Sequence, residues 1–93
     1  MDKKVNNQIS IDKVIKAFAN KNRLRLIEVL DKNPGISVEI ISEKLEMEYK
    51  MTSFHLAKLA MAGIVIKKPL GNNTLHTLTS RGKTILKFVR TLE

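Results

Sequence analysis

The sequence predicts a small, mainly α-helical fold that carries one β-hairpin near its C-terminal end. Apolar residues recur at helical spacing in five segments, and two runs with strand character, residues 64–68 and 74–78, flank a turn-prone loop. At 93 residues the chain is long enough for one domain with a modest single core. The expected order is therefore four helices, the hairpin and a final helix.

The first helix is expected to begin after Ser10, which can cap its N-terminus. Ile11, Val14, Ile15 and Phe18 follow at positions i, i+3, i+4 and i+7, which is the spacing of an amphipathic helix. Residues 1–9 are polar and are expected to form a flexible end. Residues 10–93 are then the single domain.

The second and third helices each have a polar cap and an apolar stripe. Asn20 is expected to cap the second helix, whose inner stripe is Leu26, Ile27 and Leu30. A turn at residues 33–35, Asn-Pro-Gly, should end it. Ser37 is expected to cap the third helix, with three apolar side chains pointing inward: Ile40, Ile41 and Leu45.

The C-terminal half is expected to hold a helix, a hairpin and a last helix. After a break at residues 46–48, the fourth helix should cover residues 49–62 and end at Gly63. Residues 69–73, Pro-Leu-Gly-Asn-Asn, are the expected hairpin loop because Gly and Asn tolerate positive φ. Thr79 or Ser80 should cap the last helix, whose apolar positions are Ile85, Leu86, Val89 and Leu92.

Positive charge is concentrated in this same half. Residues 49–92 contain eight Lys or Arg and both histidines, but no Asp or Glu. The whole chain has a net charge of +8 and a pI near 10.0, which favours a polyanionic partner such as nucleic acid or an anionic membrane. Because a helix and a short strand lie together in the acid-free half, we expect the polyanion to be duplex DNA.

Other classes of function lack the residues that they require. The chain has no cysteine, which excludes disulfides and thiolate metal sites, and no set of three or four metal ligands is visible. No metal or other cofactor is expected. No nucleophile–base arrangement or phosphate-binding glycine loop is present, so an enzyme is not expected. No apolar run approaches a membrane span, and the polar start is not a signal peptide, so a cytoplasmic location is expected.

Three stretches resemble the winged helix-turn-helix of ArsR-type repressors and, more loosely, MarR-type regulators. Residues 17–27, AFANKNRLRLI, are similar to the family's opening ALADPTRLRIL, without its proline. Residues 47–65 align without a gap to LSQSTVSRHLKVLREAGLV, and the shared residues include Ser53, His55, Leu56, Leu59, Ala62 and Gly63. Residues 78–83, LTSRGK, resemble the LTxKG that follows the wing.

The resemblance implies how the chain would bind DNA. The helix at residues 49–62 would enter the major groove, and the basic wing at residues 64–78 would contact the backbone or the minor groove. The first and last helices would form a homodimer through Ile11, Val14, Phe18, Ile85, Val89 and Leu92. The expected function is then a sequence-specific repressor at a pseudo-palindromic site, with half-sites roughly 34 Å apart. No determinant of a small-molecule effector is visible, and the family's cysteine metal box is replaced here by Ser37-Val38-Glu39-Ile40.

The candidate DNA-binding residues lie on the expected recognition helix and wing. They are Tyr49, Lys50, Met51, Ser53, Phe54, His55, Lys58, Lys67, Lys68, Asn72, Asn73 and His76. Lys50 can contact a phosphate or guanine, and Ser53 a phosphate or a base. His55 matches a histidine common in the family, which implies a structural or phosphate-facing role. Lys67 and Lys68, with Arg81 and Lys83, are expected to form a phosphate-facing rim.

Several alternatives remain open at this stage. Tyr49 can donate its hydroxyl to a phosphate or lie half-buried at the helix start. Met51 and Phe54 replace the family's Thr and Arg, and can pack on thymine methyl groups, against the third helix, or on a protein partner. The function can accordingly also be that of a sequence-neutral architectural DNA-binding protein or of a winged helix that binds another protein.

Overall fold

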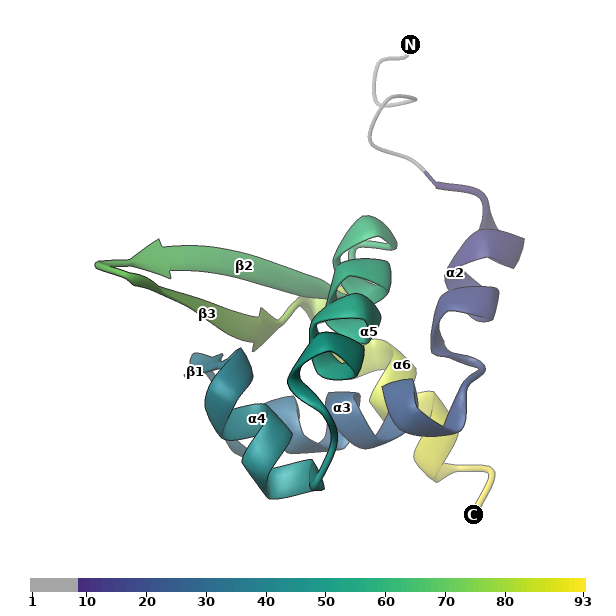
Figure 1. The fold of residues 1–93 in the computed structure, drawn as a ribbon. Helices are drawn as coiled ribbons and strands as arrows, with labels where there is room; N and C mark the ends of the chain where they lie inside the picture. Colours follow the sequence, from purple (N-terminus) through teal and green to yellow (C-terminus); the bar gives the residue numbers. More distant parts are fainter. Residues whose placement is uncertain (1–8) are drawn as a thin grey trace, which may run out of the picture.

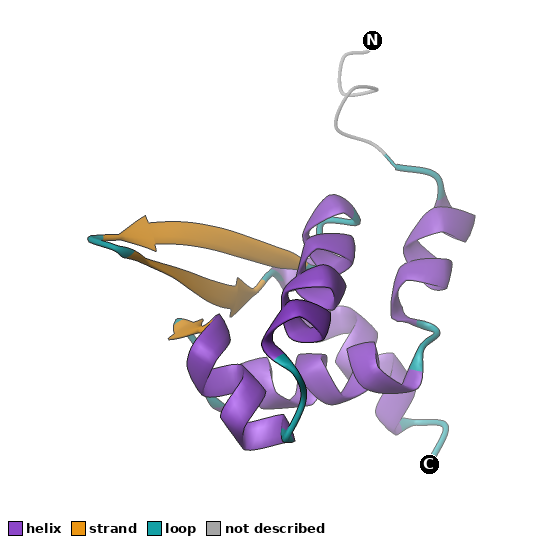
Figure 2. Cartoon of the chain, in the orientation of Figure 1, coloured by secondary structure: helices purple, strands orange, loops and turns teal. Residues whose placement is uncertain are grey.

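The structure is a computed structural model that describes residues 9–93, in which five helices pack beside a three-stranded sheet. The elements are α2 (Ile11–Phe18), α3 (Lys21–Lys32), β1 (Ile36–Ser37), α4 (Val38–Leu45), α5 (Tyr49–Met61), β2 (Val65–Leu70), β3 (Asn73–Leu78) and α6 (Ser80–Arg90). Figures 1 and 2 show β2 and β3 projecting as a hairpin from the helical body. The predicted fold class and element order are confirmed. Of the predicted flexible end, residues 1–8 lie outside the described residues, and Ile9 packs against the core.

The hydrophobic core is centred on α3, which contacts α2, α4, α5, α6 and β3. The largest fully buried apolar side chains are Leu26, Ile27, Leu30, Ile41, Leu56, Leu59 and Ile64. The predicted inner stripe of the second helix is thus confirmed. The inward position predicted for Ile40 is wrong, since 45% of its surface is exposed. Ile41 and Leu45 are one turn apart and fill the inward face of α4, so Ile40 points away from it.

Three of the four predicted caps make the expected hydrogen bond. The side-chain oxygens of Asn20, Ser37 and Thr79 each accept from the backbone N–H three residues further on, at 3.1, 3.4 and 3.1 Å. Ser10 occupies the N-cap position of α2 but makes no such bond. The start of α5 has no side-chain cap either. There the buried Thr52 donates its hydroxyl to the Glu48 carbonyl oxygen at 2.9 Å.

The sheet has the antiparallel order β1-β3-β2, and β1 was not predicted. Its two residues are too short to show strand periodicity, yet Ile36 and Ser37 pair with His76 and Leu75 on β3. The predicted five-residue hairpin loop is also wrong. Pro69 pairs with Thr74, so the turn contains only Gly71 and Asn72. The proline is tolerated because β2 is an edge strand.

The junction between α5, the hairpin and α6 is held by polar contacts and one close approach. Arg81 donates from Nη1 to the Ala62 carbonyl oxygen at 2.7 Å, which places a cation at the C-terminus of α5. Gly82 is buried, and an added Cβ there would lie 2.6 Å from the Ile64 carbonyl oxygen. These contacts fix the direction in which the hairpin leaves the body. Arg81, expected in the phosphate-facing rim, therefore has a partner within the protein.

Candidate nucleic-acid interface

Helix α5 exposes one face to solvent, and this face carries both polar and apolar side chains. Figure 1 shows it at the surface, between the hairpin and α2. Six of the predicted DNA-binding residues on this helix are exposed: Tyr49, Lys50, Met51, Ser53, Phe54 and Lys58. Tyr49, Met51 and Phe54 expose between 44% and 56% of their surface, although they are large and mostly apolar. A row of such side chains can contact base edges and methyl groups in a major groove.

Phe54 is held by its neighbours on α5 rather than by another helix. Its ring meets the His55 ring edge to face, with 5.5 Å between the ring centroids. The Lys58 Nζ atom lies 5.4 Å from the Phe54 ring centroid, within the range of a cation–π contact. With 54% of its surface exposed, Phe54 does not tuck against the preceding helix.

His55 lies beneath this face, with only 7% of its surface exposed. Arg23 donates from Nε to His55 Nδ1 at 3.0 Å, so the imidazole is neutral and carries its proton on Nε2. Burial and the nearby positive charge of Arg23 lower the pKa of His55. Arg23 also donates to the Ala17 carbonyl oxygen at 3.3 Å. The histidine thus ties α5 to α3 and, through Arg23, to the end of α2.

On the hairpin, four of the five predicted residues are exposed: Lys67, Lys68, Asn72 and Asn73. His76 is different, because only 3% of its surface is exposed and its Nδ1 atom has no hydrogen-bond partner. His76, which was a candidate DNA-binding residue, is therefore buried rather than exposed. Pairing with β1 makes β3 the central strand, and His76 shares its inward face with Leu78. Burial and Lys67 lower the pKa of His76, opposed by a backbone hydrogen bond with Ile36.

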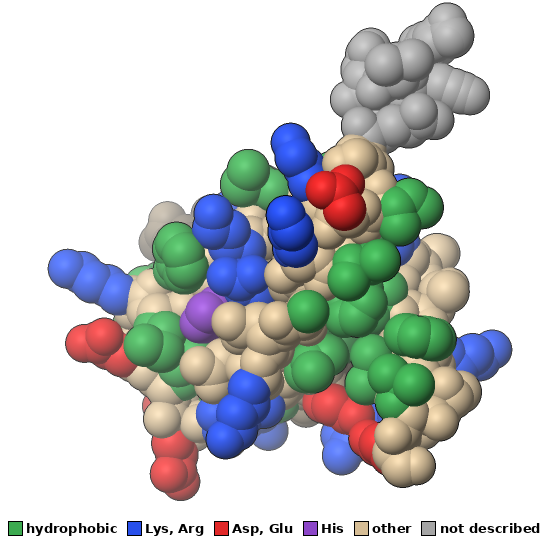
Figure 3. Space-filling view, turned by 90° about the vertical axis from the view of Figure 1, so that its right-hand side faces the viewer, with side chains coloured by type: hydrophobic (Ala, Val, Ile, Leu, Met, Phe, Trp, Pro, Cys, Tyr) green, Lys and Arg blue, Asp and Glu red, His purple; other side chains and the backbone are tan. Residues whose placement is uncertain are grey.

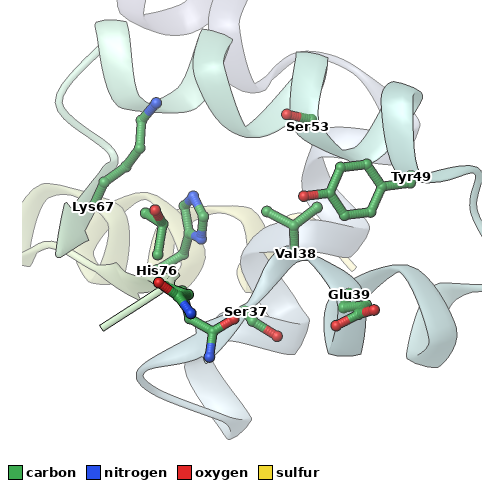
Figure 4. A pocket seen from close by; sticks show the side chains of 10 residues that line it. Ser37, Val38, Glu39, Tyr49, Ser53, Lys67 and His76 are labelled. Atoms are coloured by element: carbon green, nitrogen blue, oxygen red, sulfur yellow. The ribbon is translucent and has the colours of Figure 1, made fainter. Parts of the chain in front are cut away.

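An open groove of about 530 Å³ separates α5 from the hairpin (Figure 4). Its lining residues come from β1, α4, α5, both long strands and the turn between those strands: Ser37, Val38, Glu39, Tyr49, Ser53, Lys67, Asn72, Asn73, Thr74 and His76. Figure 4 shows Tyr49 and Ser53 of α5 on one side and Lys67 on the other. The groove brings five exposed predicted residues together. Sequence reasoning missed Thr74, which pairs with Pro69 in the hairpin, and the groove-lining role of Ser37 and Glu39, which follow from the pairing of β1 with β3.

Comparison with known proteins identifies the domain. The family described as winged helix-turn-helix DNA-binding matches residues 20–66, which is half of the chain. The chain belongs to the winged helix-turn-helix DNA-binding family. The prediction of a winged helix-turn-helix DNA-binding transcriptional regulator is confirmed. No curated protein sequence matches the chain significantly.

Solved winged helix structures are similar over nearly the whole chain. The transcriptional regulator HlyU from Vibrio vulnificus is 30% identical over 86% of this chain and 83% of that chain, with a TM-score of 0.73. HlyU from Vibrio cholerae is 28% identical over 99% and 97%, with a TM-score of 0.77. A homodimeric winged helix-turn-helix DNA-binding domain from Mycobacterium bovis is 22% identical over 99% and 85%, with a TM-score of 0.82. Because its identity is low, the similarity to the Mycobacterium bovis domain shows a shared fold and nothing further.

The winged helix domain carries a second exposed apolar surface, on α2 and α6. Figure 3, which views the molecule from the side of α2, shows hydrophobic side chains gathered there. Of the predicted dimer residues, Ile11 and Leu92 are 74% and 69% exposed, and three are half-buried: Val14, Phe18 and Val89. Ile85 is buried in the core. The prediction omitted the exposed Ile15 and Phe88, which follow the same helical spacing as Ile11 and Leu92.

Within residues 9–93, no group of three or more His, Cys, Asp or Glu side chains is placed to hold a metal ion. In the same part of the winged helix chain, no helix has the length and apolarity needed to cross a membrane.

Two acidic side chains of α3 form ion pairs with a basic side chain of α6. Arg90 Nη2 lies 3.0 Å from Glu28 Oε1 and 3.6 Å from Asp31 Oδ2. These groups are partly exposed, so the contact stabilises the domain only weakly.

We expect the free energy of unfolding to decrease as the pH falls below about 6.5. The pKa of both histidines is lowered from 6.5 in the folded domain. Below pH 6.5 the unfolded chain therefore binds more protons than the folded one. The contribution of the two histidines to the free energy of unfolding is fully present above pH 6.5 and is lost as the pH falls towards their folded-state pKa values. Urea unfolding at about pH 7.5 and 5.5 measures this. In the double variant His55→Gln/His76→Gln, the free energy of unfolding should change less between these two pH values. Equal stability of the wild type at both pH values would contradict the prediction.

Proposed function

We propose that this protein is a sequence-specific repressor that binds duplex DNA as a homodimer, with α5 in the major groove and the hairpin on the backbone or minor groove. The observation that carries this proposal is the continuity of the exposed α5 face with the basic hairpin across the open groove. A protruding helix beside a basic strand pair matches the way winged helices dock on DNA. The cytoplasmic location remains a prediction that follows from the DNA ligand.

Lysines on both sides of the groove supply the phosphate contacts in this proposal. Lys50 and Lys58 lie on α5, and Lys67 and Lys68 lie on β2. The amides of Asn72 and Asn73 at the hairpin tip add neutral donors for phosphate or minor-groove acceptors. Glu39, which also lines the groove, repels phosphate and restricts how the duplex enters. His55 and His76 are buried, and we assign them to supporting α5 and the wing rather than to touching DNA.

Base readout in this proposal comes from the N-terminal half of α5. Ser53 can bond to either base type, and the exposed Met51 and Phe54 can pack on thymine methyl groups. The readout should therefore favour steps rich in A·T pairs. Lys58, held beside the Phe54 ring, places a positive charge next to this apolar contact.

The homodimer would form through the apolar surface of α2 and α6. The exposed side chains Ile11, Ile15, Phe88 and Leu92 would be removed from water there, and Val14, Phe18 and Val89 would complete the surface. Exposed apolar surface of this kind typically marks an association site. The similar domain from Mycobacterium bovis is homodimeric. Ile85 belongs to the core of the single chain, so it would support this surface without forming it.

The proposal predicts steep salt dependence of DNA binding. If the dimer neutralises about six phosphates, log K should fall against log salt with a slope near −5. Fluorescence polarisation on random duplex, poly-A·T duplex and single-stranded DNA over a salt series measures the slope and the preference. A slope near zero on duplex DNA would refute DNA binding. Equal affinity for unrelated duplexes would instead favour a sequence-neutral architectural role.

The exposed apolar side chains of α5 favour one second candidate, a winged helix that binds a protein. Tyr49, Met51 and Phe54 together form an apolar surface that a partner could cover. The substitution Phe54→Arg separates the two functions. We expect it to strengthen binding to random duplex by adding a phosphate contact in each protomer, and to make the salt slope of the dimer steeper by about two. Unchanged DNA binding together with loss of a captured partner would favour the protein-binding function.

A further inference from the structure

The hairpin has an outer face that points away from the groove and from the core. Successive side chains on a strand alternate between its two faces, and the inner face of β2 carries Val65 in the core and Lys67 in the groove. Ile66, Lys68 and Leu70 therefore share the outer face. Their neighbours across the ladder on β3 are Thr77, Leu75 and Asn73.

The outer face combines apolar side chains with positive charge. Ile66 and Leu70 expose 54% and 64% of their surface, and Leu75, which pairs with Lys68, is half-buried. Lys68 stands between the two exposed apolar side chains, in a half of the chain where residues 49–92 contain no Asp or Glu. Such a surface attracts a partner that carries both apolar and acidic groups.

The strand β2 also has an open edge. Within residues 9–93, the sheet order β1-β3-β2 leaves one side of β2 without a neighbouring strand, and residues 66–70 are all exposed. An edge of this kind presents backbone N–H and C=O groups with which another strand can pair. Pro69 has no N–H, so a partner strand depends on the side chains of β2 as well as on backbone bonds.

Charge decides which kind of strand this edge accepts. If two copies of β2 paired with each other, their lysines would lie against one another, because Lys67 and Lys68 occupy the middle of the strand. Like charges on facing strands are destabilising, whereas opposite charges stabilise the pair. Duplex DNA supplies the opposite charge, but its phosphates make no use of Ile66 and Leu70. A strand with acidic residues in its middle and an apolar residue on either side matches both the charge and the apolar surface.

We propose that the edge and outer face of the hairpin bind an extended acidic segment of another protein, which joins the sheet as a further strand beside β2. Its acidic residues lie opposite Lys67 and Lys68, and its apolar residues lie opposite Ile66 and Leu70. Bound in this way, the segment covers the two lysines that contact phosphate in the proposed function. It therefore competes with DNA for the wing, and this part rests on the proposed function.

The test titrates the peptide TVTEEVT, blocked at both ends, into the full chain without DNA and follows the backbone amide resonances of residues 66–68 by NMR. When this peptide runs antiparallel to β2, its two glutamates fall opposite the two lysines and its valines opposite Ile66 and Leu70. The controls are TEVTVTE, which has the same composition in another order, and the basic peptide TVTKKVT. TVTEEVT should shift the amides in a saturable manner, and both controls should bind about fivefold more weakly or worse.

Matched variants separate the outer face from general charge. Ile66→Thr/Leu70→Thr keeps a strand-forming side chain at position 66 and removes both exposed apolar groups. It should bind TVTEEVT about fivefold more weakly or worse and keep the salt slope of the wild type on duplex DNA. The control Ile40→Thr removes an isoleucine of 45% exposure from α4, and it should bind the peptide as the wild type does.

A second measurement adds saturating TVTEEVT to the DNA-binding assay, where it should weaken duplex binding by the wild type about fivefold or more. Peptide binding with unchanged DNA affinity overturns the competition. Because the titration itself contains no DNA, failure of the proposed function would not hide the peptide site.

Four outcomes overturn the site itself. The amides of residues 66–68 stay unshifted, or TEVTVTE binds as well as TVTEEVT, or Ile66→Thr/Leu70→Thr binds TVTEEVT as the wild type does. In the fourth, the same amides shift with protein concentration alone, which assigns the outer face to a second copy of the chain. A loss of DNA affinity in Ile66→Thr/Leu70→Thr, together with no peptide binding by the wild type, assigns the face to DNA instead.

Discussion

Replacing Lys67 and Lys68 with Gln should weaken duplex binding by roughly 10–100-fold or more at 0.1 M salt and make the salt slope shallower by about four, because both protomers of the proposed dimer carry the substitutions. Both side chains are exposed on β2, and Lys67 lines the groove facing α5. Each lysine that meets a phosphate releases about one counterion from DNA, so the loss of two contacts in each protomer appears in the slope itself. Fluorescence polarisation across the same salt series measures affinity and slope together.

A matched variant separates these contacts from the general effect of net charge. Lys32→Gln/Lys87→Gln also removes two charges, from the exposed end of α3 and from α6, which lies behind α5 in Figure 1. It should keep the slope of the wild type within experimental error. If both double variants lost the same affinity, the hairpin would contribute only long-range attraction, and the proposed wing contact would be wrong. Urea unfolding of each variant checks that the fold is retained.

Replacing Gly82 with Ala should destabilise the domain by about 1–2 kcal/mol, although alanine is the better helix former. An added Cβ would lie 2.6 Å from both the Ile64 carbonyl oxygen and Leu78 Cδ1. Overpacking of this kind costs about 1–3 kcal/mol, against a gain of at most about 1 kcal/mol from helix propensity. The backbone atom belongs to the junction before β2 and has little freedom to move. Thermal unfolding should show a decrease in Tm of several degrees.

Thr84→Ala is the control for this substitution, because Thr84 is exposed on the same helix. Its effect should stay within about 0.5 kcal/mol. Gly82→Val should destabilise more than Gly82→Ala, since it adds two further carbons to the same contact. A Gly82→Ala protein more stable than the wild type would show that α6 can shift away from Ile64. The hairpin would then not depend on this close approach for its direction.

The order of elements and most of the core could be predicted from the sequence because they depend on local spacing. The stripe of Leu26, Ile27 and Leu30 follows the 3.6-residue period of a helix, and α3 buries it as expected. Asn20, Ser37 and Thr79 cap their helices because each side chain reaches a backbone N–H only three residues away. The exposed face of α5 follows the same helical period, because Leu56 and Leu59 occupy the opposite face and are buried in the core.

The errors in the sequence interpretation concern contacts between distant segments. β1 exists because two residues before α4 find an open edge on β3, forty positions along the chain from Ile36 to His76. That pairing makes β3 the central strand, and His76, which the sequence interpretation named as a DNA contact, is buried there. The partner of His55 could not be named either, because Arg23 lies 32 positions away on another helix.

The helices, the position of the hairpin, the basic C-terminal half and the resemblance to winged helix regulators could all be predicted from the order of residues. Each of these depends on residues close together in the chain or on composition. The tertiary structure decided which side chains face one another: the groove between α5 and the hairpin, the Arg23–His55 contact, and the outer face of the hairpin. The physical reason is that helix periodicity and capping act over a few residues. Burial and side-chain pairing act between segments that only the packed core brings together.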